Sequence, residues 1–351
     1  MIGVGIVGCN YGRTVLVPAF RADPRCEVVA LAGTDAARTA ELARAANVAR
    51  GVGDWRTLVD DPAVTAVAIA VPPDLQPEVA RRALDRGKPA FVEKPLAADL
   101  AGAQAMLDAA RKSQQPTVID FNFPELPSWQ HARAMLGGGE VGRLRHVVVN
   151  WNVENRATRL RLESWKTRGH GGGGLLGNFV CHCLHYLEWF CGPITGLSAR
   201  VFPLPDSDAE SSIALALAFA SGAGGSLQMS CASFLGSGHR LEFYGDDGAL
   251  ILANPTADYF RGFELKHARR GEDVLRYIAV DDFGSEEVAD PRIVPVARLV
   301  RRFIDACEGG GVPAPGFAEG YRVQCLIDAA RRAHVSGRWT DVAPPGTQVR
   351  A

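Results

Sequence analysis

Apolar and polar positions alternate between two patterns over the first third of the chain. Short runs of β-branched and other apolar residues predict strands at the segment that holds Val4, Ile6 and Val7 and at 26–31, 64–71, 90–92 and 117–121. Helical spacing of apolar residues predicts helices at 36–46, 78–86 and 98–112. Strands that alternate with helices in this way predict a parallel sheet covered by helices on both faces.

From about residue 122 the pattern changes. Period-two alternation predicts strands at 145–153, 212–218, 225–230 and 240–244, several of them joined by glycine turns. Helices are expected at 128–136, 296–308 and 320–335. This half therefore predicts an α/β domain built on a large, mostly antiparallel open sheet. The chain has 351 residues, and at roughly 150 residues per domain we expect two domains, 1–121 and 122–351.

Composition narrows the class of ligand. The formal net charge is −1 and no basic run stands out, which argues against nucleic acid or acidic lipid as a partner. No apolar run reaches the roughly 18 residues that span a bilayer, and the N-terminal apolar stretch has no basic segment before it. We therefore expect a cytoplasmic protein with a small-molecule ligand. The eight cysteines form no disulfide ladder and suit reduced thiols in the core.

The first strand runs into a glycine turn that is typical of a dinucleotide site. Gly8 allows a tight turn, and Gly12 allows the backbone to approach a pyrophosphate at the N-terminus of the next helix. The motif departs from G-x-G-x-x-G, because Asn10 and Arg13 occupy the second and third glycine positions. Asn tolerates left-handed backbone, so the turn is expected to survive. The alternative is an ordinary strand-to-helix turn.

Two further motifs strengthen this interpretation. Glu93, Lys94 and Pro95 follow the strand at 90–92. A glycine run at 172–174 precedes a series of polar and aromatic residues: Asn178, His182, His185, Trp189 and Gly192. Together these motifs resemble the glucose–fructose oxidoreductase, inositol dehydrogenase and rhizopine-catabolism (Gfo/Idh/MocA) family over nearly the whole chain. The resemblance implies a Rossmann dinucleotide-binding domain, a second α/β domain that often forms oligomers, and NAD(P)-linked chemistry on sugars or cyclitols.

Lys94 stands at the C-terminal end of a parallel strand, where open α/β sheets bind their ligands. An ammonium there can stabilise the negative charge that develops on a substrate oxygen during hydride transfer. The resemblance implies that Lys94 is the catalytic lysine and that Glu93 lies beside the cofactor. The alternative is a solvated lysine paired with Glu93.

Asn178, His182 and His185 are spaced to share one face of a helix. In the family pattern the first and third positions are Asp, so Asn178 and His185 are departures, and His182 inherits the acid–base role. Loss of the Asp charge is expected to weaken proton transfer through His182, or to leave Lys94 as the main catalytic side chain. We expect no metal, because Cys181 and Cys183 lie two apart on a helix and diverge. His185 is a substrate contact or a hydrogen-bonded histidine beside the cleft.

The tip of the second strand governs the choice of cofactor. It is Gly33–Thr34 and lacks the carboxylate that usually accepts the ribose 2′-hydroxyl of NAD. The cofactor is expected to be NAD(P)(H), and we favour NADP(H) because Thr34 and Arg38 can hold a 2′-phosphate. Asp35 either caps the next helix or reaches the ribose of the cofactor. The complete set of expected cofactor-binding residues is Gly8, Asn10, Tyr11, Gly12, Arg13, Gly33, Thr34, Arg38, Val71, Pro72, Glu93 and Lys94.

Substrate contacts are expected from Lys94, His182 and His185, and from two further segments. Asn122, Phe123 and Glu125 follow the fifth strand; Trp165, Lys166 and Arg168 precede the glycine run. An aromatic face suits a sugar ring, and the basic side chains suit hydroxyls, a carboxylate or a phosphate. The alternative for the second segment is a basic, solvated loop edge.

The leading hypothesis is an NAD(P)-dependent dehydrogenase or reductase acting on a secondary alcohol or ketone of a sugar, sugar derivative or cyclitol. Lys94 and His182, with Asn178 beside it, are the expected catalytic residues. The alternative is a non-catalytic protein that senses NAD(P) or sugar on the same fold. An amine or imine reductase is a third reading. By resemblance we expect a homo-oligomer, a dimer or tetramer, formed through the C-terminal sheet.

Overall fold

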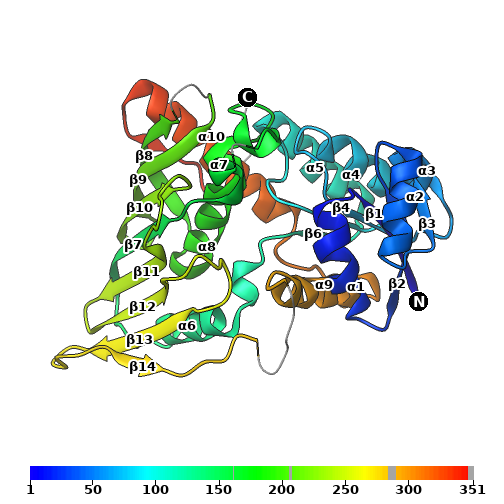
Figure 1. The fold of residues 1–351 in the computed structure, drawn as a ribbon. Coiled ribbons are helices and arrows are strands. Elements are labelled where there is room, and N and C mark those ends of the chain that lie inside the picture. The colour runs from blue at the N-terminus through cyan, green and yellow to red at the C-terminus, as the bar shows by residue number, and fades with distance from the viewer. Residues whose placement is uncertain (161, 205–207, 284–289, 347–351) are drawn as a thin grey trace. The chain divides into compact units, whose positions relative to one another are not determined.

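The computed structural model describes residues 1–160, 162–204, 208–283 and 290–346 (Figure 1). The chain forms two compact units. The first comprises Met1–Asn122 and Glu287–Gln324, and the second comprises Phe123–Glu286 and Cys325–Ala351. No helix of the described residues is both long and apolar enough to cross a membrane.

The first unit is built on a parallel sheet. Its strands are β1 (Ile2–Val7), β2 (Cys26–Ala32), β3 (Arg50–Val52), β4 (Ala66–Ile69), β5 (Ala90–Val92) and β6 (Thr117–Ile119). They are ordered β3-β2-β1-β4-β5-β6, and every neighbouring pair is parallel. This is the strand order of a Rossmann fold, as expected, and the order reverses direction between β1 and β4. Ligands of such sheets bind at the carboxyl ends of the strands on either side of that reversal.

Helices connect these strands. They are η1 (Gly12–Leu16), α1 (Val17–Arg21), α2 (Ala36–Ala45), α3 (Trp55–Asp60), α4 (Gln76–Asp85) and α5 (Leu100–Ser113). The expected helices at 36–46, 78–86 and 98–112 correspond to α2, α4 and α5. β3 and α3 were not predicted. β3 is only three residues long and lacks a buried apolar run.

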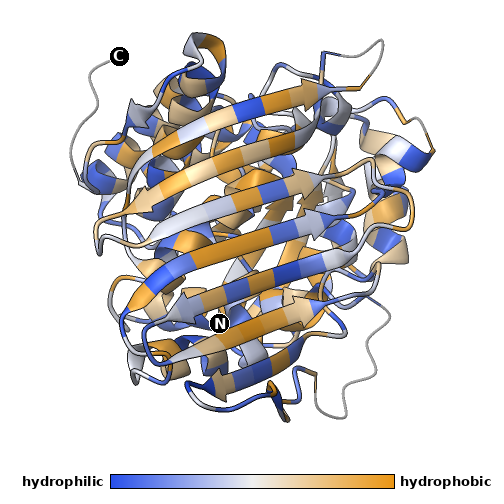
Figure 2. Ribbon diagram, turned by 90° about the vertical axis from the view of Figure 1, so that its left-hand side faces the viewer, coloured by the Kyte–Doolittle hydropathy of each residue, from blue (hydrophilic) through white to orange (hydrophobic). Residues whose placement is uncertain are grey.

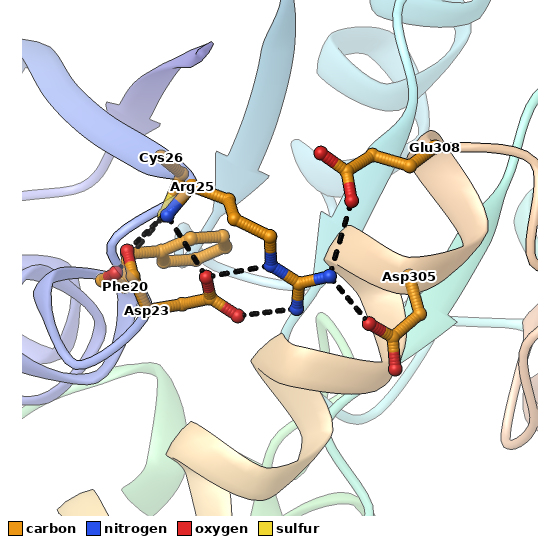
Figure 3. Close-up of polar contacts among 6 residues, drawn as sticks. All are labelled: Phe20, Asp23, Arg25, Cys26, Asp305 and Glu308. Atoms are coloured by element: carbon orange, nitrogen blue, oxygen red, sulfur yellow. Dashed lines mark hydrogen bonds and ion pairs between the residues drawn. The ribbon is translucent and has the colours of Figure 1, made fainter.

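A late segment of the chain joins this unit. In α9 (Ile293–Cys307), the Phe303 ring makes edge contacts with Phe20 and Phe91 at centroid distances of 6.2 and 5.9 Å. Figure 3 shows a second attachment, in which the Arg25 guanidinium contacts Asp23 and reaches the α9 carboxylate of Asp305, at 2.6 and 2.7 Å. This differs from the expected second domain of 122–351. A helical pattern reveals which face of α9 is apolar but not which sheet that face will cover.

The second unit is built on a nine-stranded sheet within the described residues. Its strands are β7 (Leu144–Asn152), β8 (Ile194–Pro203), β9 (Glu210–Phe219), β10 (Gly224–Ser230), β11 (Gly238–Gly245), β12 (Gly248–Asn254), β13 (Glu264–Arg269), β14 (Arg276–Ile278) and β15 (Thr340–Asp341). The order is β14-β13-β12-β11-β7-β10-β9-β8-β15, and all pairs are antiparallel except β7 with β10. The mostly antiparallel sheet was expected, and the four expected strands correspond to β7, β9, β10 and β11.

Helices cover one face of this sheet. The helical elements of the unit are η2 (Phe123–Glu125), α6 (Pro127–Gly137), α7 (Arg156–Arg159), η3 (Trp165–Thr167), η4 (Leu176–Val180) and α8 (Cys181–Cys191), while α10 (Phe317–Ser336) begins in the first unit and ends in the second. In Figure 2 the strands lie in front of these helices. Residues of β9 alternate accordingly, with Ile213, Leu215 and Leu217 buried and Ala214 and Ala216 less so. The sheet therefore has one covered and one open face.

Candidate active site

The turn after β1 needs glycine at position 8. Gly8 has φ of +119°, and a Cβ there would lie 2.2 Å from the Ala70 carbonyl oxygen. A Cβ at Gly12 would lie 2.8 Å from Cγ2 of Ile6, so the following helix packs closely on the strand. Asn10 is not among the described residues with positive φ, so the turn uses left-handed backbone at Gly8 and not at Asn10. Its carbonyl instead accepts from the Thr14 amide at 3.1 Å.

Beside this turn lie the groups expected to bind the cofactor's phosphates and ribose. The Nε of Arg13 is buried without a hydrogen-bond partner. Thr34 and Arg38 are exposed. The Asp35 carboxylate accepts from the Arg38 amide at 2.8 Å and caps α2, which confirms the capping role proposed for it.

Gly33, before Thr34, has no room for a side chain. A Cβ at this position would lie 2.4 Å from Thr39 Oγ1 and 2.7 Å from Cys9 Sγ. Any side chain at the strand tip must therefore come from Thr34, which is exposed.

The carboxyl ends of β4, β5 and β6 collect polar groups. Val71 and Pro72 follow β4, and Lys94, which is half-buried, follows β5. Gln76, at the start of α4, donates from Nε2 to the carbonyl oxygens of Pro95 at 2.6 Å and Leu96 at 3.2 Å. This side chain is 1% exposed and holds the segment that follows Lys94.

Several side chains at this edge have a buried polar atom without a partner. They are Gln76 Oε1, Glu93 Oε1, Asp120 Oδ1 and Asn122 Oδ1. Buried polar atoms are normally paired, so a concentration of unpaired ones at one edge of a sheet is typical of a ligand site.

Tyr11 and Asp120 join the glycine turn to the end of β6. The Tyr11 hydroxyl donates to Asp120 Oδ2 at 2.9 Å. Burial, followed by the negative charge of Glu93, raises the pKa of Asp120 well above its ordinary value. Burial, followed by the charge of Asp120, likewise raises the pKa of Tyr11, so the phenol stays a donor. The Arg292 guanidinium lies 5.2 Å from the centre of the Tyr11 ring.

In the second unit, the segment with the two histidines begins as a π-helix. Asn178 lies in η4, whereas His182 and His185 lie in α8. A π-turn is closed by i→i+5 hydrogen bonds, so this segment is not the single regular α-helix that was expected. His182 and His185 are 7% and 8% exposed. Burial lowers the pKa of His185 to about 3, so its ring is neutral at pH 7.

Asn178 and Lys166 line the same small pocket. Its other lining residues include Asn155, Thr158, Phe179, Glu210 and Cys231. Glu210 Oε2 is buried without a partner, and burial raises the pKa of this carboxyl. A Cβ at Gly174 would lie 1.6 Å from that oxygen, so the glycine run makes room for Glu210.

Trp165, Lys166 and Arg168 form a turn against the glycine run. A Cβ at Gly173 would lie 1.9 Å from the Trp165 carbonyl oxygen and 2.5 Å from that of Arg168. Lys166 Nζ lies 5.6 Å from the centre of the Trp165 ring. The glycine run therefore fixes this turn by close backbone contact.

The residues expected after β6 have different surroundings. Asn122 is 4% exposed and belongs to the first unit. Phe123, in the second unit, is 2% exposed and stacks on Phe260 at 4.9 Å, and its ring meets His182 edge-on at 5.2 Å. Glu125 is also buried. Phe123 thus packs in an aromatic core.

Sequence reasoning missed Gln76, Asp120, Glu210 and Arg292. A signal existed only for Asp120, a carboxylate directly after a predicted parallel strand. Gln76 and Arg292 are exceptional only through partners distant in sequence, and Glu210 only through the burial of its carboxyl group. Within the described residues, no group of three or more His, Cys, Asp and Glu side chains could hold a metal ion.

Comparison with known proteins gives a consistent result over both units. Residues 2–121 match the oxidoreductase family with an NAD-binding Rossmann fold, and residues 129–251 match the GFO/IDH/MocA C-terminal domain. An uncharacterized oxidoreductase of Synechocystis sp. is 29% identical over 97% of this chain and 95% of its own length. Levoglucosan dehydrogenase of Pseudarthrobacter phenanthrenivorans is 24% identical over 97% of each chain.

A solved structure of levoglucosan dehydrogenase in complex with NADH has the same fold. Its TM-score is 0.86 at 23% identity, and the match covers 98% of this chain and 99% of that one. The two family matches together span more than half of the chain, and the fold agrees with them. The chain therefore belongs to the Gfo/Idh/MocA family of oxidoreductases, whose N-terminal domain is an NAD-binding Rossmann fold.

Proposed function

We propose that this protein is an NAD(P)(H)-dependent dehydrogenase or reductase. It transfers hydride between the nicotinamide and a secondary alcohol or ketone of a sugar, sugar derivative or cyclitol. Two relatives with names that state a substrate, levoglucosan dehydrogenase and the D-xylose dehydrogenase of Paenarthrobacter nicotinovorans, support the sugar class.

The observation that carries the proposal is the group of unpartnered polar atoms around the carboxyl edge of the parallel sheet. It comprises Arg13 Nε, Gln76 Oε1 and Asn122 Oδ1. Gly8 and Gly12 supply a close-packed turn beside this group. Donors and acceptors of a dinucleotide suit these atoms, with Arg13 Nε toward phosphate and the amide oxygens of Gln76 and Asn122 toward hydroxyls and the carboxamide.

The chain's own contribution to the chemistry is binding, orientation and proton handling. When bound, the nicotinamide supplies or accepts the hydride. Lys94 stabilises negative charge on the reacting oxygen, and Gln76 keeps the backbone after it in place. His182 exchanges the proton of the substrate hydroxyl, with Asn178 orienting it through a neutral amide. His185, which is neutral at pH 7, serves as a hydrogen-bonding contact.

Removing Lys94 tests the proposal. Lys94→Ala should lower kcat by roughly 10²-fold or more, while cofactor affinity changes little. Substrate screening with sugars, ketosugars and cyclitols, each with both cofactors, identifies the reaction to be used. Wild-type turnover in Lys94→Ala would exclude this lysine from the mechanism.

One observation favours a second candidate function. Asn178 replaces the Asp of the family pattern, and a protein that only senses NAD(P) or a sugar does not need that carboxylate. Tight binding of cofactor and sugar by the wild-type chain, with no turnover of any alcohol or ketone, would favour the sensor over the enzyme.

For the cofactor we propose a preference for NADP(H). The strand tip at Gly33–Thr34 carries no carboxylate, the Asp35 carboxylate already caps α2, and Arg38 is exposed nearby. Fluorescence titration should give tighter binding of NADPH than of NADH. Thr34→Asp should reverse the order, because a carboxylate accepts a ribose hydroxyl and repels a phosphate. Position 33 is unsuitable for this test, since a Cβ there collides with Thr39 and Cys9.

Substrate contacts are proposed from Trp165, Lys166 and Arg168, with a supporting role for Glu210. The first three form the turn held by the glycine run, and Lys166 and Glu210 line the pocket that holds Asn178. Glu210→Gln removes a charge but keeps the shape. It should raise KM for a polyol substrate while leaving cofactor affinity unchanged, if the free Oε2 accepts a substrate hydroxyl.

For assembly we propose a homo-oligomer formed through the open face of the second unit's sheet. Small side chains such as Ala214, Ala216 and Ala218 lie on that face in β9, which β8 separates from the β15 edge of the sheet. They leave space for a second sheet to approach. Ala216→Arg should convert the oligomer to a monomer in light scattering, and an unchanged mass would exclude this face.

A further inference from the structure

Asp120 lies at the end of β6, next to the strand that carries Glu93. Val92 and Ile119 are register partners, so the next residue of each strand lies at the same edge of the sheet. The Asp120 amide donates to the Val92 carbonyl at 2.9 Å, and the Glu93 amide donates to the Ile69 carbonyl at 2.8 Å. Backbone pairing therefore places two carboxyl groups side by side.

The contacts of Asp120 leave one oxygen unused. Oδ2 accepts from the Tyr11 hydroxyl at 2.9 Å, and the side chain is only 1% exposed. Oδ1 has no donor, and neither does Oε1 of Glu93. Ionised carboxylates only accept hydrogen bonds, so two of them cannot satisfy each other. A single proton between the two side chains gives each an interaction that it lacks.

The charges around Asp120 agree with this arrangement. Burial is the largest factor that raises the pKa of its carboxyl, followed by the charge of Glu93 and a hydrogen bond to it. The Tyr11 hydrogen bond and the Lys94 charge act in the opposite direction. Arg292 also faces Tyr11, but it is paired with Asp290 at 2.5 Å.

We propose that Asp120 is a positioning residue that stays neutral at pH 7 and donates its proton to the Glu93 carboxylate. The held proton keeps Glu93 in one orientation and leaves a single negative charge beside Lys94. The consequence of this inference, a preference for one redox form of the cofactor, rests on the proposed function. Ionisation of Asp120 would add a second negative charge at this edge, which favours the positively charged oxidised nicotinamide over the reduced one.

The proton itself is tested without cofactor. The infrared spectrum of the full chain at pH 7 should contain the carbonyl band of a protonated carboxyl group, and this band should be absent from Asp120→Asn. Asp99→Asn, at the exposed N-cap of α5, is the matched control and should leave the band in place. An identical spectrum for wild type and Asp120→Asn would overturn the proposal, whether or not the chain binds NAD(P)(H).

Tyr11 provides an independent check on the same band. Tyr11→Phe removes the hydrogen bond that stabilises ionised Asp120, so the band should persist to higher pH than in the wild type. Loss of the band at lower pH in this variant would contradict the assignment of the proton to Asp120.

Binding measurements then test the consequence. The ratio of Kd values for reduced and oxidised cofactor should rise by roughly tenfold as pH increases through the ionisation of Asp120. Asp120→Asn should bind like the wild type at neutral pH and show no such pH dependence, whereas Asp120→Ala should weaken binding at every pH. If Asp120→Asn instead lost kcat with unchanged affinities, the proton would be transferred rather than held, and the positioning role would be refuted.

Discussion

Replacing Gln76 tests how the segment that follows Lys94 is held in place. Gln76 Nε2 donates to two carbonyl oxygens, those of Pro95 and Leu96, and all three residues are buried. Gln76→Ala removes the donor, and water has no ready access to replace it. A buried acceptor without a donor costs roughly 1–3 kcal/mol. The longer bond to Leu96 is assigned the lower end of that range. For the two acceptors together we expect a loss of about 3 kcal/mol in the free energy of opening this region.

Two further variants separate the hydrogen bonds from the side-chain volume. Gln76→Met keeps most of the volume and removes only the donor, so it should lose most of the same stability. Gln104 Nε2 donates to Asp108 at 2.9 Å on the outer side of α5. Gln104→Ala is the matched control, and its free energy of unfolding is expected to stay within about 0.5 kcal/mol of the wild type.

Native-state hydrogen exchange measured by mass spectrometry is the suitable assay, since it reports on 90–100 separately from the second unit. Equal exchange in Gln76→Ala and Gln104→Ala would refute the reasoning. In the enzyme assay, Gln76→Ala should lower kcat by roughly tenfold or more with little change in cofactor Kd, because it loosens the backbone next to Lys94.

Three more predictions concern the first unit. Gly8→Ala should weaken cofactor binding by at least about tenfold and destabilise the chain by about 1–3 kcal/mol, because φ at this position is +119° and the Ala70 carbonyl leaves no space for a Cβ. Unchanged cofactor titration and urea unfolding curves would contradict this. Phe303→Ala should lower the free energy of unfolding by about 3–5 kcal/mol and speed amide hydrogen exchange in β5. Faster exchange confined to the second unit would argue against the attachment of α9 to the first sheet. Arg25 lowers the pKa of Asp23, so their interaction stabilises the chain above about pH 4 and is lost as pH falls. The difference in Tm between wild type and Arg25→Gln should therefore shrink below pH 4, and a constant difference would contradict this sign.

The pattern of the chain predicted the fold class because local periodicity controls which elements form. Strands alternating with helices led to the parallel sheet, and period-two segments led to the second sheet, with boundaries within a few residues. Short elements such as β3 carry too few residues for any periodicity. The π-turn at η4 was also invisible, since its sequence reads as a regular helix.

Candidate residues at strand ends were accessible to sequence reasoning because the Rossmann topology brings those ends to one edge. That rule and the family resemblance were enough to predict Gly8, Glu93 and Lys94 as site residues. The partners of these residues did not follow from it. Gln76 reaches Pro95, Tyr11 reaches Asp120, and Arg292 reaches Tyr11 only after helices have packed on the sheet.

The sequence by itself determined the two sheets, the glycine turn and the chemistry available at position 94. Tertiary structure alone decided that α9 covers the first sheet and that Asp120 shares a buried edge with Glu93. The physical reason is the range of the forces involved. Helix and strand patterns depend on neighbours a few residues away, whereas burial and charge pairing depend on groups that only the folded chain brings together.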